Sequence, residues 1–349
     1  MLILLAAMAV PAGARQPALA RADGLLREGI SAQLAAGLAA AAAQGGGQNT
    51  TSPSAEIEAL RQAVAAAPED AALRMRLAVA YYRQGDLNHA RQELAMFHAS
   101  HPQDVRAAVL LGYTYIRLGR DAEAYDAVSG LEAGHESDLD LEYVLAYAMI
   151  RTGRATQGVP KMEKVARAKG TADAWMIAGL MRFEMRQYHE ARADAEAAVK
   201  IDPKFAGAQT LAGESRYATG DYEGAEAACR AALAQDANDF DANLYLGALH
   251  MKEGNYADAK PLIEMALTQR PSHPLARLEL ARIDRAMGNN DAAVAILESL
   301  VKTDPDWPEP HIILSTLYNI LNRPEDGKRE RAIVQRLEDR MGSEQPPQQ

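Results

Sequence analysis

The sequence has one cysteine, Cys229, and few aromatic residues, which make up 5% of its 349 positions. A single cysteine excludes an internal disulfide bond and any zinc site built from several cysteines. Basic residues are also in the minority, because 37 Lys and Arg stand against 47 Asp and Glu, a formal net charge of −10. This balance argues against nucleic-acid binding, which needs a basic face. The hydrophobic share of 48% predicts a folded protein, and abundant alanine favours packed helices over sheets.

No hydrophobic run is long enough to span a membrane. The longest near the start, residues 2–10, falls well short of the about 20 residues that a spanning helix needs. Its length suits a signal peptide, and small-x-small cleavage sites follow at 12–14 and 18–20, although no Lys or Arg precedes the run. We expect residues 1–20 to be a signal peptide that sends the protein to the periplasm or out of the cell. If this interpretation is false, the protein is cytoplasmic.

Two further segments lie outside the main pattern of the chain. Residues 21–54 predict an alanine-rich helix followed by a flexible linker, because leucine and isoleucine first recur at helical spacing and Gly, Asn, Ser and Thr then dominate. Residues 342–349 are polar and contain proline, which predicts a disordered tail.

A regular repeat, with a period of about 34 residues, runs through the rest of the chain. Glycine recurs at this spacing in two sets of three, separated by a gap in which Arg186 occupies the expected glycine position. The six glycines are Gly85, Gly119, Gly153, Gly220, Gly254 and Gly288. Alanine and proline keep the same register, and such a period indicates a stacked repeat array. The predicted units of this array, which covers residues 55–341, begin at 71, 105, 139, 172, 206, 240, 274 and 308.

Each unit reads as two helices joined by a tight turn. In the second unit, Leu111 and Tyr115 share one face of a first helix, which Gly119 ends, and a second helix begins at Asp121. Good N-cap residues stand directly before five of the first helices. These residues are Asp70, Asp104, Asp138, Thr171 and Asp239.

This helix–turn–helix pattern resembles the tetratricopeptide repeat (TPR) family, whose motif is W-x2-L-G-x2-Y…A-x3-F…P. The matches include Leu111-Gly112-Tyr115…Ala124-Val128 and Leu246-Gly247…Ala259-Ile263…Pro271. The resemblance implies an all-α fold, a right-handed superhelical solenoid of TPR repeats. Charged residues 323–340 fit the polar capping helix that a solenoid requires.

Signatures of catalysis are lacking from the sequence, which has no glycine-rich phosphate loop, no HExxH and no G-x-S-x-G. His98 and His101 have the spacing of metal ligands, but no third ligand is evident nearby, and we interpret both as surface histidines. Cys229 stands where other units have an apolar residue, which predicts a packed, unreactive thiol. We therefore expect no enzyme activity, no metal and no cofactor.

The resemblance implies a binding surface, because the first helices of TPR units line a concave groove through positions 2, 5, 9, 12 and 13. In the first four units these positions are mainly aromatic or aliphatic, and each of the first three units adds one arginine at the same position. The candidate groove residues are Met75, Val79, Tyr82, Arg83, Val109, Tyr113, Ile116, Arg117, Tyr143, Tyr147, Ile150, Arg151, Met176, Leu180 and Phe183. They predict a protein or peptide partner, extended and acidic, since arginine pairs with carboxylates.

Two alternatives bear on this groove. The apolar side chains could instead pack against neighbouring helices while the arginines are solvated. The carboxylate clamp that holds chaperone C-termini in some TPR domains needs Lys and Asn at positions 5 and 9 of the first unit. Met75 and Val79 occupy these positions, which argues against that class of partner.

Units four to seven have polar residues at position 11, where the family has a large apolar one. These residues are Arg182, Arg216, His250 and Asp284. Burying an unpaired charge is costly, so we expect this polar seam to find partners such as Glu184, Glu214 or Glu279. The seam is either structural or a second ligand site.

The sequence therefore predicts a non-catalytic TPR scaffold of the bacterial cell envelope that binds a protein partner in its concave groove. One alternative is a cytosolic TPR adaptor or regulator, and another is a glycan-binding or enzyme-accessory module.

The leader hypothesis makes a direct prediction. Protein recovered from the native cell envelope should begin at Arg21, or at Arg15 if the earlier cleavage site is used, because signal peptidase cuts after small-x-small. N-terminal sequencing checks this, and an intact Met1 on that material would contradict export with cleavage.

Overall fold

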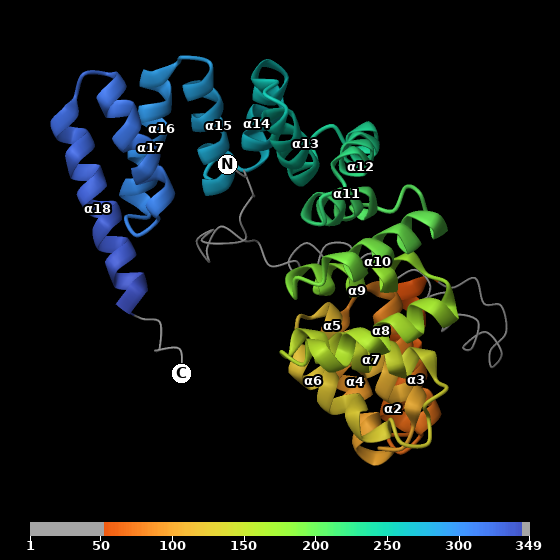
Figure 1. Cartoon of the computed structure of the whole chain (residues 1–349). Coiled ribbons are helices and arrows are strands. Elements are labelled where there is room, and N and C mark those ends of the chain that lie inside the picture. The colour runs from red at the N-terminus through yellow and green to blue at the C-terminus, as the bar shows by residue number, and fades with distance from the viewer. Residues whose placement is uncertain (1–51, 344–349) are drawn as a thin grey trace, which may run out of the picture. The chain divides into compact units, whose positions relative to one another are not determined.

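The computed structural model describes residues 52–343, in which every regular element is a helix (Figure 1). The expected leader, the alanine-rich helix before the linker and the end of the tail lie outside the described residues. The described residues divide into two compact parts, which we call the N-terminal array, residues 52–208, and the C-terminal array, residues 209–343.

The N-terminal array is a chain of helices in which each packs against the next, and α5 also contacts α7. Its elements are α2 (Pro53–Ala66), α3 (Ala71–Gln84), α4 (Leu87–Ser100), α5 (Val105–Arg117), α6 (Asp121–Val128), the 3-10 turn η2 (Ser129–Leu131), α7 (Leu139–Arg151), α8 (Ala155–Lys169), α9 (Ala172–Glu184) and α10 (Tyr188–Ile201). Contacts restricted to neighbours are typical of a repeat array.

The C-terminal array is built in the same way, and α13 also contacts α15. Its helices are α11 (Ala208–Ala218), α12 (Tyr222–Gln235), α13 (Phe240–Lys252), α14 (Tyr256–Gln269), α15 (Pro274–Ala286), α16 (Asn290–Thr303), α17 (Pro308–Ile320) and α18 (Pro324–Ser343). Its buried side chains form several local clusters along the array, each shared by adjacent helices.

Side-chain caps fix the starts of the first helices. Asp70, Asp104, Asp138 and Asp239 each accept a hydrogen bond from a backbone N–H in the first turn of the helix that follows. Thr171 occupies the cap position of α9, but its side chain makes no capping hydrogen bond. Four of the five N-caps expected from the sequence are thus confirmed by their geometry.

The tight turns between paired helices need a left-handed residue once in each repeat. All six periodic glycines have positive φ, from 71° at Gly119 to 84° at Gly220. Arg186, which replaces the missing glycine, has a φ of 60°, and Asn322 has a φ of 58°. Asn322 lies one repeat after Gly288, so the turn recurs in the eighth unit as well.

Several helix ends differ from the expected boundaries. α2 begins at Pro53, inside the expected linker, because the Ser52 hydroxyl accepts a hydrogen bond from the N–H of Ala55. α11 begins at Ala208 and not at 206, since Gly207 is left-handed with a φ of 77°. α6 ends at Val128, where a Ser-Gly pair of low helix propensity follows.

Small residues allow the helices to approach closely. A Cβ atom added to Gly112 would lie 2.5 Å from Cγ1 of Val144, and one added to Gly213 would lie 2.7 Å from Sγ of Cys229. Cys229 is fully buried, and this burial raises the pKa of its thiol to about 12. The thiol therefore stays protonated and unreactive at neutral pH, as expected from the sequence.

The strained turn at Arg186 generates a stability prediction. Arg186→Gly should raise the free energy of unfolding by roughly 1 kcal/mol, because glycine adopts positive φ without the steric cost of a Cβ atom. Denaturant titration measures the change. Asn322→Gly should raise the free energy of unfolding by less, since asparagine tolerates the left-handed backbone region. Gly85→Ala should lower it, because alanine is strained at the positive φ of that turn. A loss on Arg186→Gly would contradict the strain argument.

Candidate functional site

The candidate groove residues lie on the first helices α3, α5, α7 and α9 of the N-terminal array, and the structure buries most of them. Arg83 is exposed, and Met75, Arg117, Arg151 and Phe183 are half-buried. The other ten are buried: Val79, Tyr82, Val109, Tyr113, Ile116, Tyr143, Tyr147, Ile150, Met176 and Leu180. Packing against neighbours, the alternative considered above, thus describes most of the apolar members.

The tyrosines pack against one another and against charged side chains. The rings of Tyr113 and Tyr143 stack with their centroids 5.9 Å apart, which joins α5 to α7. The Tyr143 hydroxyl donates to Asp173 at the start of α9, over 3.3 Å. Burial is the main cause that raises the pKa of both phenols well above the usual value of 10. These phenols are therefore neutral and serve as packing and hydrogen-bonding groups.

The three arginines that recur in successive units have different surroundings. The guanidinium of Arg151 donates to Asp121 at the start of α6, over 2.9 Å, which neutralises it. The guanidinium of Arg117 lies 5.2 Å from the ring centroid of Tyr82 on α3, a cation–π arrangement. Among residues 52–343, no carboxylate forms an ion pair with Arg83 or Arg117. Both guanidinium groups thus lack a carboxylate partner among the described residues and can bind an anion.

The polar seam of position 11 is charge-paired at Arg182 and Asp284, which confirms that expectation for these two residues. Arg182 donates from Nη1 to both carboxylate oxygens of Asp194, each over 2.9 Å, and from Nη2 to Glu163 over 2.6 Å. Asp284 accepts from Nζ of Lys260 over 2.8 Å. The carboxylates at Arg182 are not those expected from the sequence, because they come from the second helices α8 and α10.

The other two members of the seam make looser contacts. Nη1 of Arg216 lies 3.6 Å from Oδ2 of Asp221, and Nδ1 of His250 lies 3.9 Å from Oε2 of Glu253. Both carboxylates belong to the turn that follows the same helix. Arg182 pairs with the second helices on both sides of it, α8 and α10, and Asp284 pairs with the preceding helix α14. These contacts tie neighbouring elements of the array together, which supports a structural role for the seam.

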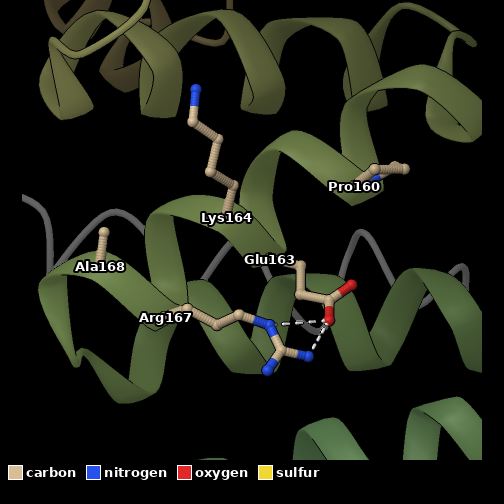
Figure 2. Close-up of a pocket in the computed structure, with 5 residues that line it drawn as sticks. All are labelled: Pro160, Glu163, Lys164, Arg167 and Ala168. Atoms are coloured by element: carbon tan, nitrogen blue, oxygen red, sulfur yellow. Dashed lines mark hydrogen bonds and ion pairs between the residues drawn. The ribbon is translucent and has the colours of Figure 1, made fainter.

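A pocket of about 420 Å³ lies along one side of α8 and includes Glu163, the partner of Arg182 (Figure 2). Pro160, Glu163, Lys164, Arg167 and Ala168 line it, and Figure 2 shows Arg167 paired with Glu163. The lining charges already pair within the protein. Among residues 52–343, no group of three or more His, Cys, Asp or Glu side chains is placed to hold a metal ion.

Of the two carboxyl groups that pair with Arg182, Asp194 has the more strongly shifted pKa. Its side chain is 2% exposed on α10, and burial raises its pKa to about 7, aided by the negative charge of Glu163 and opposed by Arg182. The sequence analysis missed both Asp194 and Glu163. The sequence does contain a sign that Asp194 is buried: it lies three residues after Ala191, and this helical spacing places it on the apolar face of its helix.

The raised pKa of Asp194 predicts a pH-dependent stability. The folded protein keeps this proton up to about pH 7, whereas the unfolded chain releases it near pH 4. Raising the pH from 4 to 7 should therefore remove stability, on the order of 1 kcal/mol for each pH unit. Asp194→Asn should make this slope smaller by the contribution of that one group, as measured by denaturant unfolding at several pH values. The exposed Asp126→Asn should keep it, and an unchanged slope in Asp194→Asn would contradict the assignment.

None of the helices formed by residues 52–343 combines the length and apolar character that a membrane span requires.

A search of curated proteins returned no significant match. Among family models, Tetratricopeptide repeat matches at residues 57–97 and 178–240, and a second model of that description matches at 250–317.

Solved structures show the same fold at low sequence identity. The chain in the APC/C hetero-tetramer Cut9–Hcn1 has a TM-score of 0.52 and 12% identity, over 83% of this chain and 57% of that one. Pseudomonas aeruginosa pilF has a TM-score of 0.52 and 17% identity, and the match covers 59% of this chain and 94% of pilF. The C-terminal part of a TPR repeat-containing protein from Cytophaga hutchinsonii has a TM-score of 0.50 and 16% identity. This match covers 66% of this chain and 95% of that one. With its period and its helix pairs, the chain belongs to the tetratricopeptide repeat family.

Proposed function

We propose that this protein is a non-catalytic interaction scaffold of the bacterial cell envelope, whose N-terminal array binds an extended acidic segment of a partner protein. Membership of the TPR family supports an interaction scaffold. The expected leader at residues 1–20 supports the periplasm or the cell exterior. The observation that carries the proposed binding surface is the pair Arg83 and Arg117.

These two arginines occupy the last turns of α3 and α5, and the contact between Arg117 and the Tyr82 ring brings these turns together. A guanidinium over an aromatic face keeps its N–H groups directed along its edges, where they can donate to a carboxylate. Arg151 is taken by Asp121, so we assign the partner's carboxylates to Arg83 and Arg117. The buried tyrosines hold these helices in register and do not contact the partner themselves.

The similar folds agree with such a role. The hetero-tetramer Cut9–Hcn1 is an assembly of two different polypeptides, and one of its chains has this fold. The match covers 57% of that chain, so the comparison supports an assembly role in general terms. The surface and the acidic chemistry proposed here rest on the arginines of this sequence.

The proposal predicts a charge-dependent interaction. Arg83→Glu and Arg117→Glu should each weaken binding of a fluorescein-labelled peptide of alternating glutamate and leucine, about fivefold or more at low salt. The loss should shrink at high salt, because ions screen exposed charges. Fluorescence anisotropy with the full chain measures the dissociation constant.

A charge reversal elsewhere in the same array supplies the control. Lys200 is exposed on the second helix α10, so Lys200→Glu should leave binding nearly unchanged. Equal losses in Lys200→Glu and the two arginine variants would mean that only net charge matters, and would remove Arg83 and Arg117 as the site.

A further inference from the structure

The C-terminal array contains a buried carboxylate that is only half satisfied. Glu279 on α15 is 1% exposed; its Oε1 accepts from Nη1 of Arg282 over 2.7 Å, and its Oε2 has no hydrogen-bond partner. Nη2 of Arg282 turns away to Glu309 on α17. One guanidinium is thus shared between two carboxylates, and the orphaned oxygen carries a desolvation cost. We call Glu279, Arg282 and Glu309 the acidic cluster; its net charge is −1 when both carboxylates are ionised.

Aromatic side chains stand near this cluster. The ring of Tyr217 on α11 packs edge-on against Tyr222 and Tyr245, with centroids 5.5 and 5.4 Å away. Burial, followed by the negative charge of Glu279, raises the pKa of Tyr217 to about 12. Nζ of Lys252 already lies 4.0 Å from the centroid of Tyr222. One cation of the chain, Lys252, thus already rests on an aromatic ring of this array.

An exposed apolar stripe continues from the acidic cluster along α17. Glu309, Ile312, Thr316 and Ile320 are spaced by three, four and four residues, which places them on one face of the helix. Ile312 is 48% exposed and Ile320 is 59% exposed. The opposite face of α17 is buried, so the stripe is not needed for packing. Its buried residues are Pro310, His311, Ile313, Leu314, Ser315, Leu317 and Tyr318.

We propose that the acidic cluster and the stripe form a second binding surface, which takes a partner polypeptide segment carrying a basic side chain beside apolar ones. The basic group pairs with Glu309, whose side chain is 44% exposed. Arg282 is then released to donate to both oxygens of Glu279, which satisfies the orphaned Oε2. The partner's apolar side chains cover Ile312 and Ile320. The charge of this surface is opposite to that of Arg83 and Arg117 in the other array.

The probe is a fluorescein-labelled peptide of alternating leucine and arginine, tested against the full chain by fluorescence anisotropy. Glu309→Gln and Ile320→Ser should each weaken its binding about tenfold, as loss of a central contact does. Both positions are exposed enough that the variants fold, which thermal unfolding checks. The matched controls, Glu325→Gln on α18 and Ile201→Ser on α10, remove an exposed charge and an exposed isoleucine elsewhere and should leave binding unchanged.

Three outcomes would overturn this assignment. Equal losses in the controls and the test variants would show non-specific attraction to an acidic protein. Unchanged binding in both Glu309→Gln and Ile320→Ser would exclude the surface. Competition by ethylguanidinium at the concentrations at which the peptide binds would indicate a site for a small cation. Arg83→Glu and Arg117→Glu should not weaken this basic probe, so its result is independent of the function proposed for the N-terminal array.

Discussion

The close approach of neighbouring helices is the constraint on which the rest of this structure depends. Where Gly112 meets Val144 and Gly213 meets Cys229, a single added methyl group has no room. Such contacts fix each helix against its neighbour, and their repetition from unit to unit extends the arrangement without a central core. First helices of successive units therefore come into contact, as α5 does with α7, and Arg117 reaches the Tyr82 ring one unit earlier.

Charge distinguishes the two arrays once this common framework is in place. The N-terminal array places two arginines without carboxylate partners among the described residues on neighbouring first helices, whereas the C-terminal array places Glu279 and Glu309 around one arginine. A scaffold with two surfaces of opposite charge can hold two different segments and reject each at the wrong surface. The net charge of −10 conceals this difference because it sums over both arrays.

The burial of the candidate groove shows where reasoning from a repeat motif stops. Tyr113, Tyr143 and Tyr147 occupy positions that are exposed in an open solenoid, yet here they are buried. Their exposure depends on how tightly consecutive units pack and on which side chains stack, as Tyr113 stacks on Tyr143. A one-unit motif contains no information on these distances. Arg83 at the end of α3 remains exposed, whereas Arg117 is half-buried against the Tyr82 ring.

The sequence alone determined the class of the fold, the repeat length and the turn positions, because helix periodicity, N-caps and left-handed glycines act within a few residues of one another. Even the missing glycine at Arg186 marked a real left-handed turn. Only the tertiary structure decided which charges meet. Arg182 finds Asp194 and Glu163 on two second helices, and Glu279 shares Arg282 with Glu309 on the next unit. Such pairings depend on distances between helices, which a sequence pattern read one unit at a time does not specify.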